Sequence, residues 1–212
     1  MPLYKKILHD SETTIYIWKI SETLDELLSD VNLNQHSQNR FNNMKSELHQ
    51  RGFLSVRKLL QLANYSDSDL YYDTSGKPHL TDQKYISISH SHFMSAIIIS
   101  NKPVGIDIEI LKDKVLKIAS KFMDIRLLDE LSQENKIKKA STIWGIKETV
   151  FKIMNQTGIS FFEHIFEDNF QLIDKKTKAN LVFNGETTNF EIFFDEIENY
   201  ILVWGNPTLI GH

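Results

Sequence analysis

Alternating apolar and polar residues predict β-strands in the first half of the chain. Residues 13–18 are β-branched and aromatic, residues 85–90 alternate strictly, and residues 95–100 form a short apolar run that we expect to be buried. Residues 105–110 alternate isoleucine with glycine, aspartate and glutamate. Because residues 101–103 have the composition of a turn, we expect the strands at 95–100 and 105–110 to pair as a hairpin.

Helical spacing predicts helices between the first two of these strands. Ser21 is the expected N-cap of a short helix with leucines on one face, and residues 32–38 have the composition of a polar loop. Residues 39–62 carry apolar side chains at helical spacing. Gly52 lies inside this run, so we expect an interruption there rather than one continuous helix.

After residue 110 the pattern is first helical and then strand-like. Residues 115–122 and 125–131 are short amphipathic segments, and a longer helix is predicted at 137–154, with an apolar seam of Ile143, Ile146, Val150 and Ile153. Strands are predicted at 170–173, 181–183, 190–194 and 200–204, and Asn184-Gly185 indicates a hairpin turn. Helices followed by strands, twice over, favour an α+β fold with mostly antiparallel sheets.

Length, composition and charge narrow the class of protein. The chain has 212 residues, enough for one large domain or for two lobes, and it contains no cysteine for disulfides or thiolate chemistry. No apolar run approaches a membrane span, and no apolar signal core follows the opening residues Met1 to Lys6. We therefore expect a cytoplasmic protein. A net charge of −4 disfavours broad nucleic-acid binding.

The stretch at 105–110 carries the first candidate site. Side chains alternate between the faces of a strand, so Asp107 and Glu109 share one face. Two neighbouring carboxylates repel each other, and a hard divalent cation such as Mg²⁺ would relieve this repulsion. The alternative is a half-exposed strand with its polar residues turned to water, and these six residues by themselves leave both interpretations open.

A second candidate site lies on the predicted helix at 137–154. Trp144, Glu148 and Lys152 are spaced at i, i+4 and i+8 and therefore share one helix face. Glu148 could supply a third carboxylate to an ion, and Lys152 could meet an anionic substrate group. The alternative is a surface Glu–Lys pair below a packed tryptophan, which is common on exposed helices.

A third cluster of polar residues closes the strand at 85–90. Ser89 and His90 could donate hydrogen bonds to a phosphate, or could simply begin a serine-rich turn. Upstream, Gly76-Lys77-Pro78 forms a rigid turn that could present Lys77 to the same ligand.

Together these motifs resemble the 4′-phosphopantetheinyl transferases, specifically the larger, two-lobed type that activates surfactin synthetase. The family carries G-I-D-[IV]-E, found here at 105–109, and about forty residues later W-x-x-K-E-x-x-x-K, found here at 144–152. The G-K-P turn at 76–78, the S-H-S element at 89–91 and the G-[LI]-S segment at 158–160 also match. The matches run from about residue 51 to residue 160.

The resemblance implies a reaction and roles for individual residues. Coenzyme A would donate its phosphopantetheine arm to a serine of an apo acyl carrier protein or carrier domain, leaving adenosine 3′,5′-bisphosphate. The implied Mg²⁺ ligands are Asp107, Glu109 and Glu148. Lys152 would meet the diphosphate and assist the leaving group, so Glu148 and Lys152 are the implied catalytic residues. The implied contacts to the nucleotide end are Arg51, Lys77, Pro78, Ser89 and His90.

One departure from the family concerns the base that deprotonates the carrier serine. The family usually has F-F-S-x-x-E after the metal-binding strand, with its glutamate proposed as the base. The matching stretch here ends in Leu127, which cannot take a proton. Asp124, Asp129 and Glu130 are neighbouring carboxylates that could replace it, and Glu148 or a metal-bound water could do so instead. The base therefore stays unassigned.

The resemblance also implies a fold and a mode of docking. It predicts two similar α+β lobes, 1–102 for the nucleotide end and 103–212 for the metal site and catalytic helix, with the active site in a cleft between them. We expect a monomer, because both lobes belong to one chain. Carrier proteins are typically acidic, so we predict that they dock on a basic patch made of Lys112, Lys114, Lys117, Lys121 and Arg126.

Two other classes of function compete with transfer. A Mg²⁺-dependent phosphohydrolase or nuclease can also use three carboxylates, although the acidic balance of the chain disfavours a nuclease. A non-catalytic module that binds coenzyme A or a carrier is the third class, and the leucine at position 127 supports it.

Overall fold

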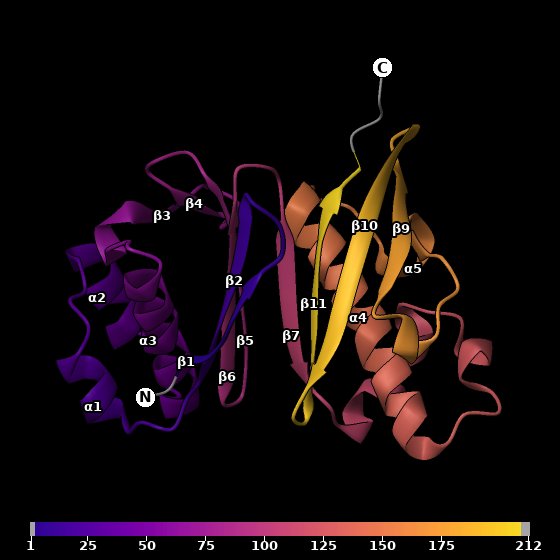
Figure 1. Cartoon of the computed structure of the whole chain (residues 1–212), viewed down its shortest axis with the longest axis horizontal. Helices are drawn as coiled ribbons and strands as arrows, with labels where there is room; N and C mark the ends of the chain where they lie inside the picture. The colour runs from indigo at the N-terminus through magenta and orange to yellow at the C-terminus, as the bar shows by residue number, and fades with distance from the viewer. Residues whose placement is uncertain (1–2, 209–212) are drawn as a thin grey trace. The chain divides into compact units, whose positions relative to one another are not determined.

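The computed structural model describes residues 3–208. Met1 and Pro2, which open the stretch considered for an export signal, and residues 209–212 lie outside it. The chain divides into two compact units, Met1–Lys102 and Pro103–His212. Each unit holds a β-sheet with a long helix packed against it (Figure 1), and every strand pair in these sheets is antiparallel. This confirms the α+β fold class predicted from the sequence.

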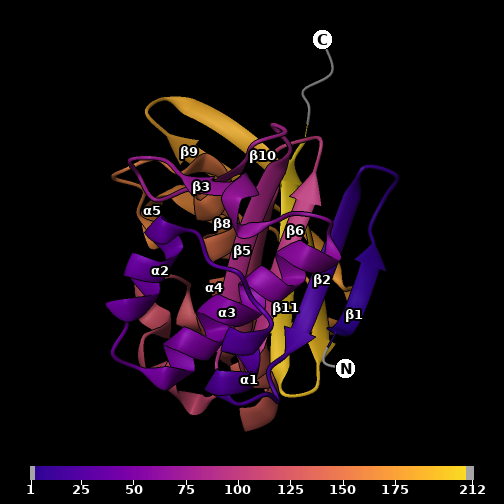
Figure 2. The same ribbon diagram turned by 90° about the vertical axis from the view of Figure 1, so that its left-hand side faces the viewer.

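The first unit contains a four-stranded sheet in the order β1-β2-β6-β5, with a small two-stranded sheet β3-β4 beside it. Figure 2 shows its helices gathered on one side of the sheet. Its strands are β1 Leu3–Leu8, β2 Thr13–Lys19, β3 Leu70–Tyr72, β4 Pro78–Leu80, β5 Tyr85–Ser91 and β6 Met94–Ser100. Its helices are α1 Leu24–Ser29, α2 Gln35–Asn42, α3 Glu47–Leu62 and the 3₁₀ turn Asp67–Asp69.

The core of the first unit lies between helix α3 and the sheet. Buried residues of α3, such as Leu54 and Leu59, pack in one cluster with Ile97 and Ile99 of β6 and with Ile86 of β5. Ile97 and Ile99 are two apart along β6, and Ile86 pairs in register with Ile99, so all three share one face of the sheet. The alternation predicted for 85–90 is therefore confirmed, because the isoleucines of this strand face helix α3.

The helix boundaries in this unit differ from those predicted. The polar segment predicted to be a loop forms the start of α2, because Asn34 caps it through a hydrogen bond from the backbone N–H of Ser37. The first short helix is capped by Thr23 rather than Ser21, in a reciprocal pair with Glu26. The helical run breaks at 43–46 and not at Gly52, which lies inside α3.

The predicted hairpin between 95–100 and 105–110 is wrong. Strand β6 pairs with β2 on one edge and with β5 on the other, so both of its edges are already hydrogen-bonded. Strand β7, Gly105–Ile110, therefore pairs with β11 in the second unit. The physical reason is that a strand in the middle of a sheet has no edge left for the next strand along the chain.

The second unit contains a five-stranded sheet in the order β7-β11-β10-β9-β8. After β7 the chain makes three 3₁₀ turns, Asp113–Lys117, Ala119–Lys121 and Ile125–Leu128, where short helical segments were predicted. Helix α4 spans Gln133–Met154 and α5 spans Phe161–His164. The remaining strands are β8 Ile165–Glu167, β9 Lys176–Phe183, β10 Glu186–Ile197 and β11 Tyr200–Pro207.

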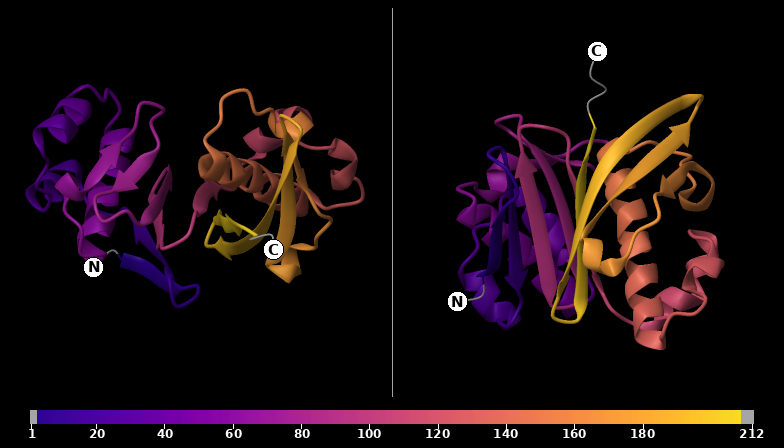
Figure 3. Two further views of the ribbon diagram at one scale, coloured as in Figure 1. Left: turned by 90° about the horizontal axis from the view of Figure 1, so that it is seen from above. Right: turned by 45° about the vertical axis from the view of Figure 1, so that its right-hand side comes forward.

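Helix α4 lies along one face of this sheet (Figure 3) and forms the core of the second unit. The predicted seam is confirmed, because Ile143, Ile146, Val150 and Ile153 are all buried in one cluster with Ile201 and Val203 of β11 among others. Burying side chains of this size stabilises a fold by about 1.5–3 kcal/mol each. Asn155 ends the helix in a left-handed conformation, with φ of 50°.

The C-terminal strands are longer than predicted, with one exception. Asn184 and Gly185 both have positive φ and form the predicted hairpin turn between β9 and β10. The strand predicted at 170–173 is instead a 3₁₀ turn, Leu172–Asp174, and the short strand β8 was not predicted. The ring of Phe170 packs against Phe194 in the core, which explains its apolar character without a strand. No helix within residues 3–208 is both long enough and apolar enough to cross a membrane.

Candidate active site

The two carboxylates of strand β7 face helix α4. Asp107 pairs in register with Val203 and Glu109 with Ile201, and both of these β11 residues belong to the core beneath the helix. Asp107 is only 4% exposed. The alternative of a strand face turned to water therefore does not hold for Asp107, which is held against the helix instead.

Two glycines allow the strand and helix to approach each other closely. A Cβ on Gly105 would lie 2.5 Å from the backbone oxygen of Thr149 in α4. A Cβ on Gly145 would lie 2.6 Å from a methyl of Val203 and 3.7 Å from Oδ2 of Asp107. Real Cβ atoms do not come this close, so the backbone of α4 can lie over β7 and β11 only because both positions are glycine.

The predicted stripe of α4 meets β7 residue by residue. At one end the indole N–H of Trp144 donates to Oε1 of Glu109, at 3.1 Å. At the other end the ammonium of Lys152 lies 2.7 Å from Oδ1 of Asp107 and donates to the backbone oxygen of Ile106 at 3.0 Å. Helix and strand therefore run in opposite directions along this contact, and Glu148 lies between its two ends on the helix.

Glu148 lies within electrostatic reach of Asp107. Burial raises the pKa of Glu148, the negative charge of Asp107 raises it further, and the ammonium of Lys152 acts in the opposite direction. Each effect is expected when two carboxylates and one ammonium share a partly buried site. The structure therefore brings these three predicted residues together.

The residues present fit a hard divalent cation in their chemistry. Asp107, Glu109 and Glu148 offer only oxygen ligands, and the mutual repulsion of Asp107 and Glu148 is a cost that a bound cation would remove. In the conformations described for residues 3–208, no three acidic or histidine side chains converge as a ready metal cluster. In these conformations the ammonium of Lys152 lies against Asp107 and takes the place of a positive ion.

A buried lysine of the same helix turns away from this stripe. Lys147 donates to the backbone oxygen of Ile165 and forms an ion pair with Glu167, and burial lowers the pKa of Lys147. Eight residues earlier, the buried Lys139 donates to the backbone oxygen of Phe170. These two lysines attach the segment from β8 to Phe170 to the far side of α4. The sequence motif contains Lys147 but gave no sign of its partner.

The segment between β7 and α4 carries the position at which the family base is expected. Leu127 lies in the 3₁₀ turn Ile125–Leu128 and is 42% exposed. Asp124 caps this turn, and its hydrogen bonds from the side chain of Arg126 lower its pKa. A carboxylate held ionised in this way is a weak base, so Asp124 is a poor replacement for the missing glutamate.

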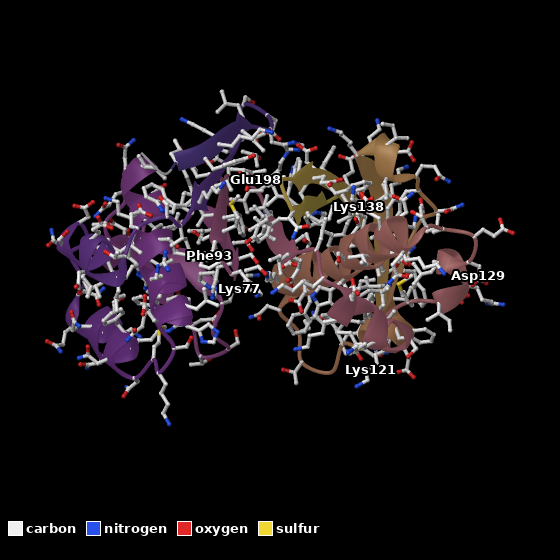
Figure 4. All side chains as sticks on the ribbon, turned by 90° about the horizontal axis from the view of Figure 1, so that it is seen from below. Lys77, Phe93, Lys121, Asp129, Lys138 and Glu198 are labelled. Atoms are coloured by element: carbon white, nitrogen blue, oxygen red, sulfur yellow. The ribbon has the colours of Figure 1, made fainter. Side chains whose placement is uncertain are left out.

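The predicted basic patch lies on the same segment, of which Figure 4 labels Lys121 and Asp129. Its four lysines are exposed: Lys112, Lys114, Lys117 and Lys121. The fifth member, Arg126, is paired with Asp124 and contributes less positive charge than predicted. The lysines therefore carry the charge of this patch.

In the first unit, His90 borders a cavity. The cavity has a volume of about 280 Å³, and its lining includes Arg40, His49, Gly52, Tyr72 and His90. A Cβ on Gly52 would lie 2.7 Å from Cδ2 of His90, so the glycine of α3 makes room for the imidazole ring of β5. The ring of His49 stands perpendicular to that of His90, with centroids 6.3 Å apart.

The other predicted nucleotide contacts come from several elements of the first unit. Ser89 and His90 are neighbours in β5 and point to opposite faces of the sheet, Ser89 being buried and His90 exposed. The guanidinium of Arg51 lies over the ring of Phe93, in the turn between β5 and β6. Lys77 precedes Pro78, the first residue of β4, and burial lowers the pKa of the Lys77 ammonium. These residues stay predicted contacts of the nucleotide end.

Sequence reasoning missed several residues that line this cavity. The guanidinium of Arg40 stacks over the ring of Tyr72, with its central carbon 4.7 Å from the ring centroid. Arg40 lies in α2. The break between α2 and α3 was not predicted at 43–46, so the direction of the Arg40 side chain could not be predicted either. The asparagine N-cap at 34 was the available signal for that helix.

Comparison with known proteins identifies the second unit. Residues 103–204 match the model of the 4′-phosphopantetheinyl transferase superfamily, so this half of the chain belongs to that superfamily. This confirms the resemblance found in the motifs. The chain is also 32% identical over 111 residues to the 4′-phosphopantetheinyl transferase gsp of Aneurinibacillus migulanus. The aligned segment is 50% of this chain, and the chain spans about half, 47%, of that relative.

Proposed function

We propose that this protein transfers the 4′-phosphopantetheine arm of coenzyme A to a serine of an apo acyl carrier protein or carrier domain, releasing adenosine 3′,5′-bisphosphate. The observation that carries the proposal is the contact between β7 and α4, where Asp107, Glu148 and Lys152 meet within a superfamily match. Phosphoryl transfer depends mainly on positioning and on neutralising charge, and this contact offers oxygen ligands beside a cation.

In this proposal Asp107, Glu109 and Glu148 hold Mg²⁺. When bound, the ion would supply positive charge that polarises the attacked phosphorus and neutralises the leaving phosphate. Lys152 would turn from Asp107 toward the diphosphate, which its flexible side chain allows, and would assist the leaving group. The acceptor of the serine proton stays unassigned, because Leu127 cannot act, Asp124 is tied to Arg126, and a Glu148 that holds Mg²⁺ is kept ionised.

The nucleotide end of coenzyme A is assigned to the first unit. The proposed contacts are Arg51, Lys77, Pro78, Ser89 and His90. The cavity beside His90 supports this assignment, because it combines an arginine and histidines, which suit a phosphate, with an aromatic wall, which suits a base. Coenzyme A and carrier proteins are cytoplasmic substrates, so we place the reaction there.

The direct test is mass spectrometry of the carrier. The protein is incubated with coenzyme A, Mg²⁺ and an apo acyl carrier protein, and we expect the carrier to gain the mass of one phosphopantetheine. Asp107→Ala should abolish the gain, and Asp113→Ala, on the neighbouring exposed turn, should retain it. Phosphate release without carrier modification would point to a phosphohydrolase, and coenzyme A binding without either product would point to a binding module.

The exposed lysines after β7 are the proposed docking surface for an acidic carrier. Reversing the charge of Lys117 and Lys121 together should raise the KM for the carrier at low salt and leave the KM for coenzyme A unchanged. The matched control reverses Lys176 and Lys178, two exposed lysines of β9 in the same unit. An unchanged carrier KM in the Lys117 and Lys121 variant would remove this surface from the proposal.

A further inference from the structure

We propose that Trp144 is a positioning residue for Glu109, which its indole N–H holds in the orientation needed to bind the metal ion. The inference rests on the proposed function, because it assumes that Glu109 is a metal ligand. It adds a role that the packing of a tryptophan does not by itself imply. It begins from the hydrogen bond of 3.1 Å between Nε1 of Trp144 and Oε1 of Glu109.

The chemistry of the indole suits this role. A tryptophan N–H only donates, carries no charge and does not titrate, so it can fix one carboxylate oxygen without competing as a cation. Lys152 differs, because its ammonium at Asp107 takes the place of a positive ion. An arriving cation would therefore displace the Lys152 contact and could keep the Trp144 contact in place.

The indole ring is itself fixed by two other aromatic residues. The ring of Phe122 meets it edge-on, with centroids 5.1 Å apart, and the ring of Phe161 packs against it at 5.4 Å, tilted by 59°. Phe122 is fully buried, and Phe161 is supported in turn by Phe151 at 5.8 Å. Aromatic neighbours on two sides restrict rotation of the indole, so its N–H keeps a constant direction.

Restraint of Glu109 favours metal binding because a free glutamate side chain has several rotatable bonds. Binding an ion through an unrestrained glutamate costs the conformational entropy of ordering that side chain. Groups that orient a metal ligand through a hydrogen bond typically change metal affinity by about 10- to 100-fold when they are removed. We infer the same range for the indole of Trp144.

The test is Mn²⁺ binding, measured by electron paramagnetic resonance with coenzyme A present and no carrier protein. Trp144→Phe keeps an aromatic ring and removes the donor, and we expect Mn²⁺ affinity to fall by about 10- to 100-fold. In the transfer assay the KM for Mg²⁺ should rise, and kcat at saturating Mg²⁺ should stay close to that of the original protein. If Trp144 had only a structural role, its replacement would not raise the KM for Mg²⁺ while leaving kcat unchanged.

The matched control is Trp204→Phe, a tryptophan of β11 that stacks on Phe193 and belongs to no part of the proposed site. It should bind Mn²⁺ as the original protein does. Asp107→Ala should abolish Mn²⁺ binding, and if it does not, the metal site of the proposed function fails. If Asp107→Ala abolishes binding and Trp144→Phe leaves it unchanged, the role of Trp144 alone is overturned.

A second measurement leaves Trp144 in place and so does not depend on the folding of that variant. The chain has three tryptophans, so replacing Trp18 and Trp204 by phenylalanine leaves Trp144 as the sole tryptophan, which can be excited selectively. Because the indole contacts Glu109, adding Mg²⁺ with coenzyme A should shift its emission. The shift should disappear in Asp107→Ala. Emission that does not respond to Mg²⁺ would contradict the proposal.

Discussion

The ammonium of Lys152 lies 2.7 Å from Oδ1 of Asp107, and the aspartate is almost fully buried. One turn of α4 earlier, Glu148 feels the charge of the same aspartate. Without a metal ion, Lys152 therefore supplies the positive charge that stabilises this acidic site. Its position beside these carboxylates, at the end of the stripe formed by Trp144, Glu148 and Lys152, makes Lys152 the first target for a stability experiment.

Removing this ammonium should destabilise the protein when no metal is present. Lys152→Met removes the ammonium beside a buried carboxylate, a change that typically costs 3–5 kcal/mol. Lys152 is 25% exposed, so we expect the lower end, about 3 kcal/mol, in urea unfolding with a chelator. Mg²⁺ with coenzyme A should then stabilise the variant more than the original protein, because the ion provides the missing charge.

The control for this experiment lies on the same helix. Lys138 pairs with Glu134 and Glu196, whose carboxylates are well exposed, so Lys138→Met should cost no more than about 1 kcal/mol. Equal losses in the two variants would show that Lys152 does not neutralise a buried charge.

Two glycine substitutions should have opposite effects on stability. Gly105→Ala places a Cβ 2.5 Å from a backbone oxygen of α4, which cannot move without shifting the helix. This substitution should lower the free energy of unfolding by about 1–3 kcal/mol. Gly52→Ala meets the edge of the exposed His90 ring, which can turn away, and adds a better helix former to α3. In thermal unfolding, the melting temperature of Gly105→Ala should be well below that of Gly52→Ala.

The same pair of variants also tests the nucleotide site. If His90 contacts coenzyme A, Gly52→Ala should weaken coenzyme A binding, measured by calorimetry, without lowering the melting temperature. Unchanged affinity in Gly52→Ala would argue against His90 as a contact.

The buried pair of Lys147 and Glu167 should behave as a coupled unit. Lys147→Met leaves the carboxylate of Glu167, whose side chain is 9% exposed, without its partner and should cost about 3–5 kcal/mol. Lys147→Met combined with Glu167→Leu removes both charges and should recover part of that loss. A double-mutant cycle from urea unfolding measures this coupling, and simple additivity of the two single changes would refute it.

Acid should weaken the attachment of Lys102, the last residue of the first unit, to Asp10. The hydrogen bond from the Lys102 ammonium at 2.9 Å holds the pKa of Asp10 below its ordinary value of 3.8. A lowered pKa means that the stabilising effect is fully present above 3.8 and is lost as pH falls below it. The pair is about one third exposed, so we expect a contribution of about 0.5–1 kcal/mol at neutral pH.

Asp10→Asn should therefore be less stable than the original protein at pH 7 by this small amount. The difference should shrink as urea unfolding is repeated at lower pH and should vanish in strong acid. A difference that stays constant down to pH 2 would mean that another contact of Asp10 is responsible.

Much of the fold could be predicted because local patterns and tertiary packing agree. The seam of α4 and the isoleucine face of β5 are periodic, and burial of those faces fixes the elements. The Asn184-Gly185 turn has a strong intrinsic preference for positive φ. Predictions failed where packing overrode the local signal. Gly52 lies buried inside α3 without breaking it, and its missing side chain makes room for the ring of His90.

The candidate site could likewise be predicted only in part. The sequence by itself determined which residues are candidates for the chemistry, because the spacing of Asp107, Glu109, Glu148 and Lys152 places two of them on one strand face and two on one helix face. Only the tertiary structure decided what each of them contacts. A period of two or of 3.6 residues gives the direction of a side chain within its own element, and the partner lies on an element dozens of residues away. The contacts of Trp144 with Glu109, of Lys152 with Asp107 and of Lys147 with Glu167 follow from how closely α4 approaches its neighbours.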